Sequence, residues 1–463
     1  MGIPEDAASA RFAGLRAGFD GAVLLPGDPG YDEARVLFNA MVDRRPAVIA
    51  QCASPDDVAR ALGLARQEGL DVAVRGGGHG VAGTALAEGG LVVDLRRMCE
   101  VTVDPDVRTA RVGGGATMSH LDRAGQPYDL ATTGGRVSTT GVGGFTLGGG
   151  TGWLDRTFGL ACDNLLSVEL VTAAGEVVVA SDTENADLFW GLHGGGGNFG
   201  VATALTFRLH RVPTMTLTLL MWSPAEAEQA VRAVRDLFEG GPDEIGGGVL
   251  WMTAPDEEFV PRELVGRLVC SAVVTFVGPE DEARDVVAPL LALRPAAQLI
   301  AEMPYADLQS SLDDPPGYRN YWSAEHLSAL PDEAVAAFCR VSGQLISPAP
   351  AQSALFAGGG AAGRATTDYP IPWRKDSWTV HPFGLWADPA DDERVVGWTR
   401  DLRAAVRPWA TGAVYLNFIG DEGADRVRAG LGEASYARLT EVKRAWDPDN
   451  VFRHNHNIVP VTA

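Results

Sequence analysis

Cysteine is scarce in this sequence, and long apolar runs are absent. The 463 residues include five scattered cysteines, Cys52, Cys99, Cys162, Cys270 and Cys339, and no C-x-x-C pair. An odd, dispersed set is typical of reduced thiols in a cytoplasmic protein and indicates neither a disulfide framework nor a metal site. No uncharged apolar stretch approaches the ~18 residues of a membrane span. The N-terminus lacks the basic and apolar regions of a secretory signal.

Positive charge is scarce as well. The chain has 38 Lys and Arg residues against 60 Asp and Glu residues, which gives a net charge of −22. An acidic surface repels phosphate backbones and anionic headgroups, so the composition argues against nucleic acid and membrane surfaces as partners. Hydrophobic residues make up 46% of the chain. This length and composition predict two or three globular domains with a large core.

Glycine is abundant, with 56 residues, and much of it lies in three stretches. The first stretch is Gly76–Gly80, which contains His79 and lies between the β-branched runs Asp71–Arg75 and Leu91–Asp94. We expect two strands that bracket a tight loop. Backbone without Cβ atoms can close on a phosphate or pyrophosphate, with His79 at the rim of the anion site. Alternatively, the glycines make only a turn, and His79 is a hydrogen-bonded loop residue.

Two segments match the dinucleotide-binding pattern G-x-G-x-x-G, Gly78–Gly83 and Gly195–Gly200. A Rossmann site needs a strand before this pattern and a helix after it, within a βαβ unit of about 30 residues. The segment Thr84–Gly90 is too short for that helix, and the second match follows a helix-like segment and precedes a strand-like one. We therefore reject a nicotinamide site at both positions.

The second and third glycine stretches, Thr132–Gly152 and Gly194–Gly200, are interleaved with apolar side chains. Flexible linkers lack such residues. We therefore interpret the second stretch as an ordered wall of a ligand site, and the third as the entry to a strand over Val201–Leu209.

The composition of the chain changes near Arg211–Pro213. Glycine clusters become rare after this point, and the residue patterns predict alternating strands and helices. We predict an α+β domain over 211–412, between an N-terminal part, 1–210, and a C-terminal return, 413–463. In the return we expect a strand over Ala413–Phe418 and a helix over Ala434–Trp446. Aromatic residues gather in the later half of the middle domain, where they could pack a core or line a pocket for a flat substrate. These are Tyr305, Tyr318, Tyr321, Trp322, Tyr369, Trp373, Trp378 and Trp386.

In this order and spacing, the motifs resemble the FAD-linked oxidases of the vanillyl-alcohol oxidase/p-cresol methylhydroxylase (PCMH) superfamily. The resemblance is to the berberine-bridge-enzyme-like branch, and especially to its bacterial secondary-metabolism members. It implies an α+β, two-domain PCMH-type FAD-binding fold, whose substrate domain is an antiparallel sheet covered by helices. The segments that carry the resemblance are Arg75–His79, Gly141–Gly152, Gly159–Leu165, Gly194–Gly200, Tyr415–Asn417, Asp447–Arg453 and Asn455–Asn457.

The resemblance implies a large set of FAD-binding residues and no metal. They are Val74, Arg75, Gly76, Gly77, Gly78, His79, Gly80, Gly135, Val137, Thr140, Gly141, Gly143, Gly144, Gly149, Gly150, Trp153, Asp163, Asn164, Leu165, Gly197, Asn198, Phe199, Val201, Tyr415, Asn417, Asn455 and Asn457. His79 corresponds to the residue that bonds the flavin 8α-methyl. Doubly linked members carry a cysteine where this chain has Val137, so we expect a single covalent bond. Cys162 lies in a different segment, and we interpret it as a small buried side chain.

For catalysis the resemblance points to Tyr415, Asn417 and Thr140. Thr140 matches a position that faces the flavin and influences oxygen access. The glutamate base of some members is missing, because Gly363–Thr367 contains no carboxylate. Tyr415 is the alternative base, with Asn417 next inward on the expected strand, unless Tyr415 is only structural.

The implied activity is an FAD-dependent two-electron oxidation of a small organic alcohol, phenol or polyketide-like metabolite, with O2 reduced to H2O2. The partners are then a small-molecule substrate and O2, in a monomer or homodimer. The alternatives are oxidation of a sugar lactol, a flavin dehydrogenase that avoids oxygen, or a protein that binds FAD and a ligand without turnover.

Overall fold

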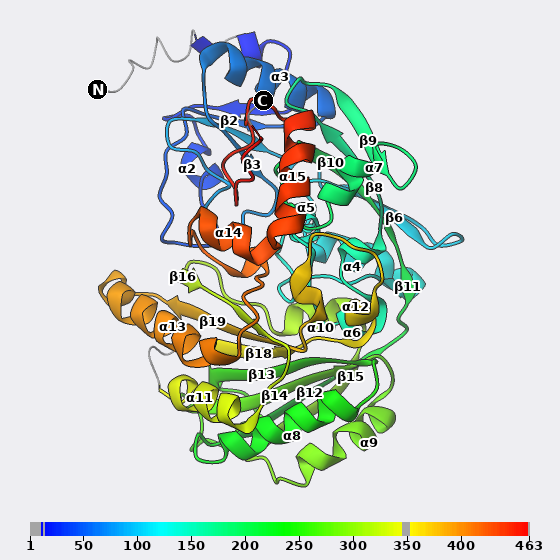
Figure 1. Cartoon of the computed structure of the whole chain (residues 1–463), viewed down its shortest axis with the longest axis vertical. Coiled ribbons are helices and arrows are strands. Elements are labelled where there is room, and N and C mark those ends of the chain that lie inside the picture. Colours follow the sequence, from blue (N-terminus) through cyan, green and yellow to red (C-terminus); the bar gives the residue numbers. More distant parts are fainter. Residues whose placement is uncertain (1–10, 13, 345–351, 462–463) are drawn as a thin grey trace.

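The computed structural model describes residues 11–12, 14–344 and 352–461. Figure 1 shows the N-terminal elements and the helices α14 and α15 in the upper part, and a broad sheet with its covering helices in the lower part. No helix within the described ranges is long and apolar enough to cross a membrane.

The first sheet carries the glycine loop that contains His79. Its strand order is β1-β2-β4-β3, with β3 and β2 parallel to β4. The expected strands on either side of the loop are confirmed as β3 and β4, and Thr84–Gly90 forms no helix. The helix α3 begins after Ser54, and the Ser54 side chain caps this helix by accepting a hydrogen bond from the Asp57 amide. The bounds are β1 Ala22–Leu24, α2 Tyr31–Ala34, β2 Val48–Gln51, α3 Pro55–Glu68, β3 Val72–Arg75 and β4 Leu91–Asp94.

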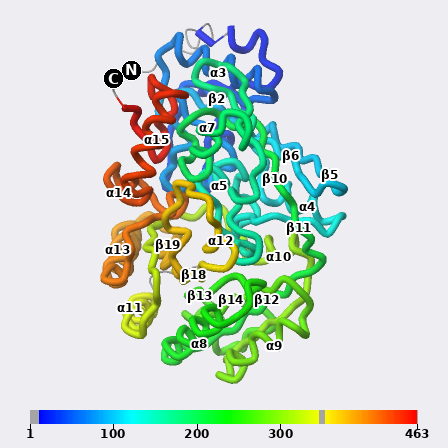
Figure 2. The backbone as a smooth tube through the Cα atoms, turned by 45° about the vertical axis from the view of Figure 1, so that its right-hand side comes forward, coloured from blue at the N-terminus to red at the C-terminus, as the bar shows by residue number. Residues whose placement is uncertain are grey.

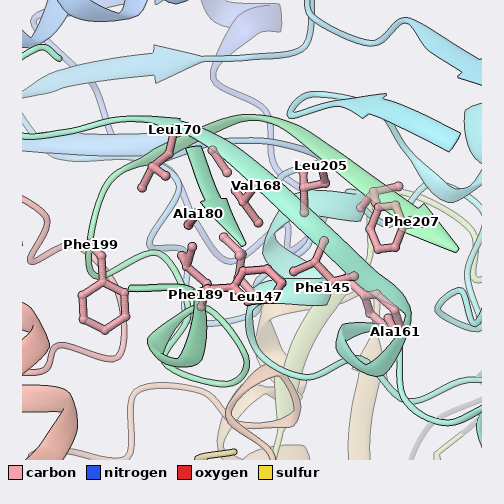
Figure 3. Packing of buried hydrophobic residues seen from close by; sticks show 14 of the residues in the cluster. Phe145, Leu147, Ala161, Val168, Leu170, Ala180, Phe189, Phe199, Leu205 and Phe207 are labelled. Carbon is pink, nitrogen blue, oxygen red and sulfur yellow. The ribbon is translucent and has the colours of Figure 1, made fainter. Parts of the chain in front are cut away.

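The second sheet is antiparallel, with the order β5-β6-β10-β8-β9. Its inner face packs on α5 and α7 in a core that Figure 3 shows, with Phe145 and Leu147 of α5 against Val168 and Leu205. This packing holds the second glycine stretch in place. The bounds are β5 Val101–Asp104, β6 Thr109–Gly113, α4 Met118–Gly125, β7 Leu130–Ala131, α5 Val142–Leu147, α6 Asp155–Phe158, β8 Leu165–Val171, β9 Val177–Ser181, α7 Ala186–Gly191, β10 Val201–Arg208 and β11 His210–Arg211.

The third sheet has the order β15-β12-β14-β13-β18-β19-β16, with β17 paired to β19, and every pairing in it is antiparallel. Because side chains alternate along a strand, one face packs on α8, α9, α11 and α13, while the other faces the N-terminal part (Figure 1). The bounds are β12 Met215–Trp222, α8 Ala227–Gly240, β13 Ile245–Thr253, β14 Leu268–Phe276, α9 Glu280–Leu291, β15 Ala297–Met303, α10 Tyr305–Ser311, β16 Arg319–Trp322, β17 Glu325–Leu327, α11 Asp332–Ser342, β18 Ser353–Ala357, α12 Gly360–Arg364, β19 Trp378–Trp386 and α13 Asp392–Val406.

The C-terminal segment returns to the N-terminal part through α14, Ala424–Leu431, and α15, Glu433–Trp446. Figure 2 shows α15 in red beside the N-terminal elements. Asn198 holds the tail, since its Oδ1 accepts from the Ile458 amide at 3.0 Å and its Nδ2 donates to the His456 carbonyl at 3.2 Å. The tail therefore lies against the N-terminal part, and the expected helix over Ala434–Trp446 is confirmed as α15.

The predicted strand over Ala413–Phe418 is wrong, because Leu416–Phe418 forms a 3₁₀ turn. Local apolar alternation resembles a strand here, but the side chain of Asn417 turns back to the Phe145 carbonyl at 3.1 Å instead of following a neighbouring strand. The larger prediction is confirmed: the chain has an α+β fold with a helix-covered antiparallel sheet. All five cysteines are free, and Cys162 is buried as expected.

Candidate functional site

A large cavity of about 830 Å³ lies between the glycine loops and the uncovered face of the third sheet. All three glycine stretches reach it, as does the C-terminal tail through Phe452 and Asn455. Its volume falls in the range of roughly 300–1,000 Å³ that is typical of small-molecule and cofactor sites. The fold thus brings together segments that are far apart in the sequence.

Several loop glycines leave open space beside the cavity. A Cβ placed at Gly144, Gly196 or Gly197 would meet no atom within 4 Å, and all three residues line the cavity. A ligand can therefore approach the backbone directly at these points, which a side chain would prevent. Gly196 also has a φ of 67°, a left-handed conformation that favours glycine.

His79 lies on the wall of this cavity. Its Nε2 is 2.7 Å from Thr139 Oγ1, and its ring stacks on Phe38 with a centroid separation of 4.0 Å and an interplanar angle of 20°. His79 lines the cavity, and burial lowers the pKa of its imidazole to about 4. The imidazole is therefore neutral at physiological pH.

Tyr415 and Asn417 meet at the same cavity. Asn417 Nδ2 donates to Tyr415 Oη at 2.9 Å, and the Tyr415 side chain is buried against Trp373. Burial raises the pKa of Tyr415, although Asn417 and the nearby Arg136 favour the ionised form. Tyr415 is therefore a neutral phenol at physiological pH, and a resting tyrosinate is disfavoured.

Most of the expected site residues line the cavity. These are Val74, Gly76, Gly77, Gly78, His79, Gly80, Gly135, Val137, Thr140, Gly141, Gly143, Gly144, Trp153, Gly197, Asn198, Tyr415, Asn417 and Asn455. The other expected residues lie outside the lining. These are Arg75, Gly149, Gly150, Asp163, Asn164, Leu165, Phe199, Val201 and Asn457.

The residues outside the lining hold neighbouring structure together. Arg75 donates to the carbonyls of Ala34 and Val36, behind the glycine loop. Asp163 forms a 2.5 Å ion pair with Arg374, and Asn164 Nδ2 donates to two carbonyls in the preceding turn. Gly149 and Gly150 adopt positive φ values, and Leu165, Phe199 and Val201 are buried in the core. Their expected contact with FAD stays a prediction.

The uncovered face of the third sheet supplies the opposite wall, here called the sheet wall, which sequence reasoning missed. It consists of the described strand residues of this sheet that line the cavity: Leu217, Leu219, Leu250, Met252, Leu299, Met303, Trp322, Phe356, His381 and Phe383. Of the eight aromatic residues predicted to form a core or a pocket, only Trp322 lines the cavity. Trp378 and Trp386 are buried on β19.

His381 is the most polar member of the sheet wall. Its Nδ1 lies 2.8 Å from the Ser323 carbonyl, and its ring stacks on Phe418 at 4.0 Å and 8°. Burial lowers its pKa to about 3. The sequence held one signal for His381: Thr379, His381 and Phe383 follow a two-residue period, which places them on the same face of β19. No local pattern showed whether this face of the strand meets the cavity.

The chain matches the FAD binding domain family over residues 46–181 and the berberine and berberine-like family over residues 414–459. It is 32% identical to (R)-6-hydroxynicotine oxidase from Paenarthrobacter nicotinovorans over 458 residues, which cover 95% of this chain and 97% of that protein.

Solved structures show the same fold. The crystal structure of 6-hydroxy-D-nicotine oxidase from Arthrobacter nicotinovorans superposes with a TM-score of 0.84 at 29% identity, over 96% of this chain and 99% of that one. A carbohydrate oxidase from Microdochium nivale has a TM-score of 0.84 at 23% identity, over 98% and 100% of the two chains. The similarity to the carbohydrate oxidase shows only that the two proteins share a fold.

Proposed function

Because the chain belongs to the berberine-bridge-enzyme-like family of FAD-linked oxidoreductases, we propose that it is an oxidase of a small organic alcohol or related secondary metabolite. FAD held at this cavity would supply the redox chemistry, a two-electron oxidation of the substrate with O2 as the final acceptor and H2O2 as the product. The single observation that carries this proposal is the large cavity, whose one wall is glycine backbone and whose other wall is a side-chain surface.

The residues present fit FAD. The open backbone at Gly144, Gly196 and Gly197 leaves room for a dinucleotide, and successive amides in such loops bind phosphate oxygens. Asn455 lines the cavity, and its buried Oδ1 has no hydrogen-bond partner within the described ranges. Trp153 Nε1 is a second buried atom of the lining without such a partner. Unpaired buried polar atoms of this kind are costly unless a ligand satisfies them.

We further propose that His79 forms the single covalent bond to FAD. A neutral imidazole is the nucleophilic form, and burial keeps His79 neutral. If Nε2 carries the proton and donates it to Thr139, the Nδ1 lone pair is left for bonding. Val137 lines the cavity where a second tether would need a cysteine.

We assign supporting roles to Thr140, Tyr415 and Asn417, all of which line the cavity. Thr140 would control oxygen access, so a Thr140→Val variant should change the rate at which O2 reoxidises the reduced enzyme. Unchanged oxygen reactivity would argue against this role. Tyr415, held by Asn417, would donate a hydrogen bond to the substrate as a neutral phenol.

The proposal is tested on the purified protein. A flavin absorption spectrum, yellow colour that survives acid precipitation, and peroxide release with a panel of alcohols would support it. A colourless protein after growth with riboflavin would refute it. Reduction by an alcohol without reaction with O2 would instead identify a dehydrogenase.

A further inference from the structure

The sheet wall offers very few polar groups to a ligand. Its ten residues come from β12, β13, β15, β16, β18 and β19, and eight of them have side chains that form no ordinary hydrogen bond. Of the other two, Trp322 uses its Nε1 to donate to Asn320 Oδ1 at 3.2 Å. His381 is therefore the single group in this wall, among the described residues, that can still bind a polar substituent.

The hydrogen bond to the Ser323 carbonyl fixes the tautomer of His381. A carbonyl only accepts, so Nδ1 must carry the proton, and Nε2 is left with a lone pair. No protein group within the described ranges donates to that lone pair, although His381 is only 4% exposed and lines the cavity. The stacking against Phe418 keeps the ring in this orientation. The Nε2 atom of His381 is thus a preorganised hydrogen-bond acceptor on a wall of mostly apolar side chains.

We propose that the substrate of this site is a flat, largely apolar alcohol, whose hydroxyl group donates its hydrogen bond to Nε2 of His381. The proposal rests on the oxidase function proposed above and makes His381 a catalytic residue. The Leu, Met and Phe side chains of the sheet wall suit an aromatic ring, whereas the hydroxyl groups of a sugar would gain no partners there and would have to reach polar residues elsewhere in the lining, such as Glu257 and Asp313.

The proposed step is the oxidation of the alcohol to a carbonyl compound, with His381 as the proton acceptor. The carbinol carbon gives a hydride to the bound FAD, the O–H proton passes to Nε2 of His381, and the C–O bond becomes a carbonyl. The two electrons leave with the hydride, and the proton on His381 returns to solvent before the next cycle. A weakly basic imidazole is sufficient, because loss of the hydride makes the hydroxyl proton strongly acidic.

The first test measures binding to the wild-type holoenzyme. 2-Naphthol and 2-methoxynaphthalene have the same ring, but only the first can donate a hydrogen bond, and neither has a carbinol C–H. We expect 2-naphthol to bind about tenfold more tightly in flavin absorbance titrations, as one hydrogen bond predicts. Equal affinities, or no binding by either compound, would overturn the proposal.

The second test uses variants. In His381→Phe the preference for 2-naphthol should disappear, and anaerobic FAD reduction by 2-naphthalenemethanol should slow by about 100-fold or more. His381→Gln keeps an acceptor and should retain part of the preference. Asp106→Asn, at an exposed position on the β5–β6 turn, is the control and should keep the full preference. A His381→Phe protein that retains FAD and the wild-type preference would contradict the proposal.

The outcomes also separate this inference from the oxidase function. One outcome is that cellobiose or glucose reduces the FAD and releases peroxide, whereas no aromatic alcohol reduces the FAD. This outcome would support the oxidase function and refute the proposed substrate class. If the purified protein is colourless, the oxidase function itself falls.

Discussion

The backbones of Gly77 and Gly141 lie against each other, so closely that a Cβ on Gly77 would be 2.4 Å from the Gly141 nitrogen. A Cβ on Gly141 would in turn be 2.3 Å from the Gly77 nitrogen. Only two glycines permit this contact, since the clashing atoms are backbone and cannot rotate away. The first and second glycine stretches therefore form one wall, although they are far apart in the sequence.

A Gly77→Ala substitution should separate the two stretches. We expect a loss of stability of about 1–3 kcal/mol, as for overpacked interiors, together with weak or no FAD binding. Gly197→Ala is the matched control, because its Cβ would meet no protein atom within 4 Å. It should leave the apoprotein's melting temperature unchanged and weaken only FAD binding. Equal melting temperatures for both variants would contradict this account.

Replacement of His79 tests the proposed tether. His79→Ala should release FAD on acid precipitation, and intact mass spectrometry should show no flavin adduct. The same measurement on Thr139→Ala, which removes only the hydrogen-bond partner of Nε2, should show a slower but detectable adduct. A flavin mass shift that persists in His79→Ala would place the bond elsewhere.

Asp122 should make stability depend on pH. Its side chain is buried and accepts from Gln309 Nε2 at 3.3 Å, and burial raises its pKa from 3.8 to about 8. The unfolded chain releases this proton near pH 4, so the group's contribution to stability falls as pH rises from about 4 to about 8. At 1.36 kcal/mol per pKa unit, the loss of folding stability is on the order of 5 kcal/mol.

The uncharged Asp122→Asn variant should therefore become progressively more stable than the wild type between pH 5 and pH 8. Urea unfolding at several pH values measures the difference. Asp106→Asn, an exposed position on the β5–β6 turn, is the control and should show no such trend. A difference for Asp122→Asn that does not change with pH would refute the interpretation.

Lys443 should be essential for holding the C-terminal tail. Its Nζ donates to Asp447 Oδ2 at 2.7 Å and to the carbonyls of Asn198 and Phe452. Both side chains of the ion pair are fully buried. Lys443→Met leaves a buried carboxylate without its cation, which typically costs about 3–5 kcal/mol. The only other lysine, Lys375, is exposed, so Lys375→Met should leave the unfolding free energy nearly unchanged.

Local patterns in the sequence predicted a large part of the fold. The strands around the His79 loop and the helix of the C-terminal return follow from turn residues and apolar spacing. Such signals involve only near neighbours in the chain, so one sequence is enough to show them. The strand expected at Tyr415 failed because contacts with α5, distant in sequence, decide the local backbone there.

The sequence alone predicted that the glycine loops and His79 meet at one site, because a backbone without Cβ atoms can be identified from residue types, and these residues do line one cavity. Tertiary structure alone decided which side chains face those loops. Arg75, Asp163 and Asn164 lie outside the cavity lining, while His381 lines the cavity from a strand of the third sheet. The physical reason is that strand register over long separations sets which face of β19 meets the cavity, and no short-range pattern encodes that pairing.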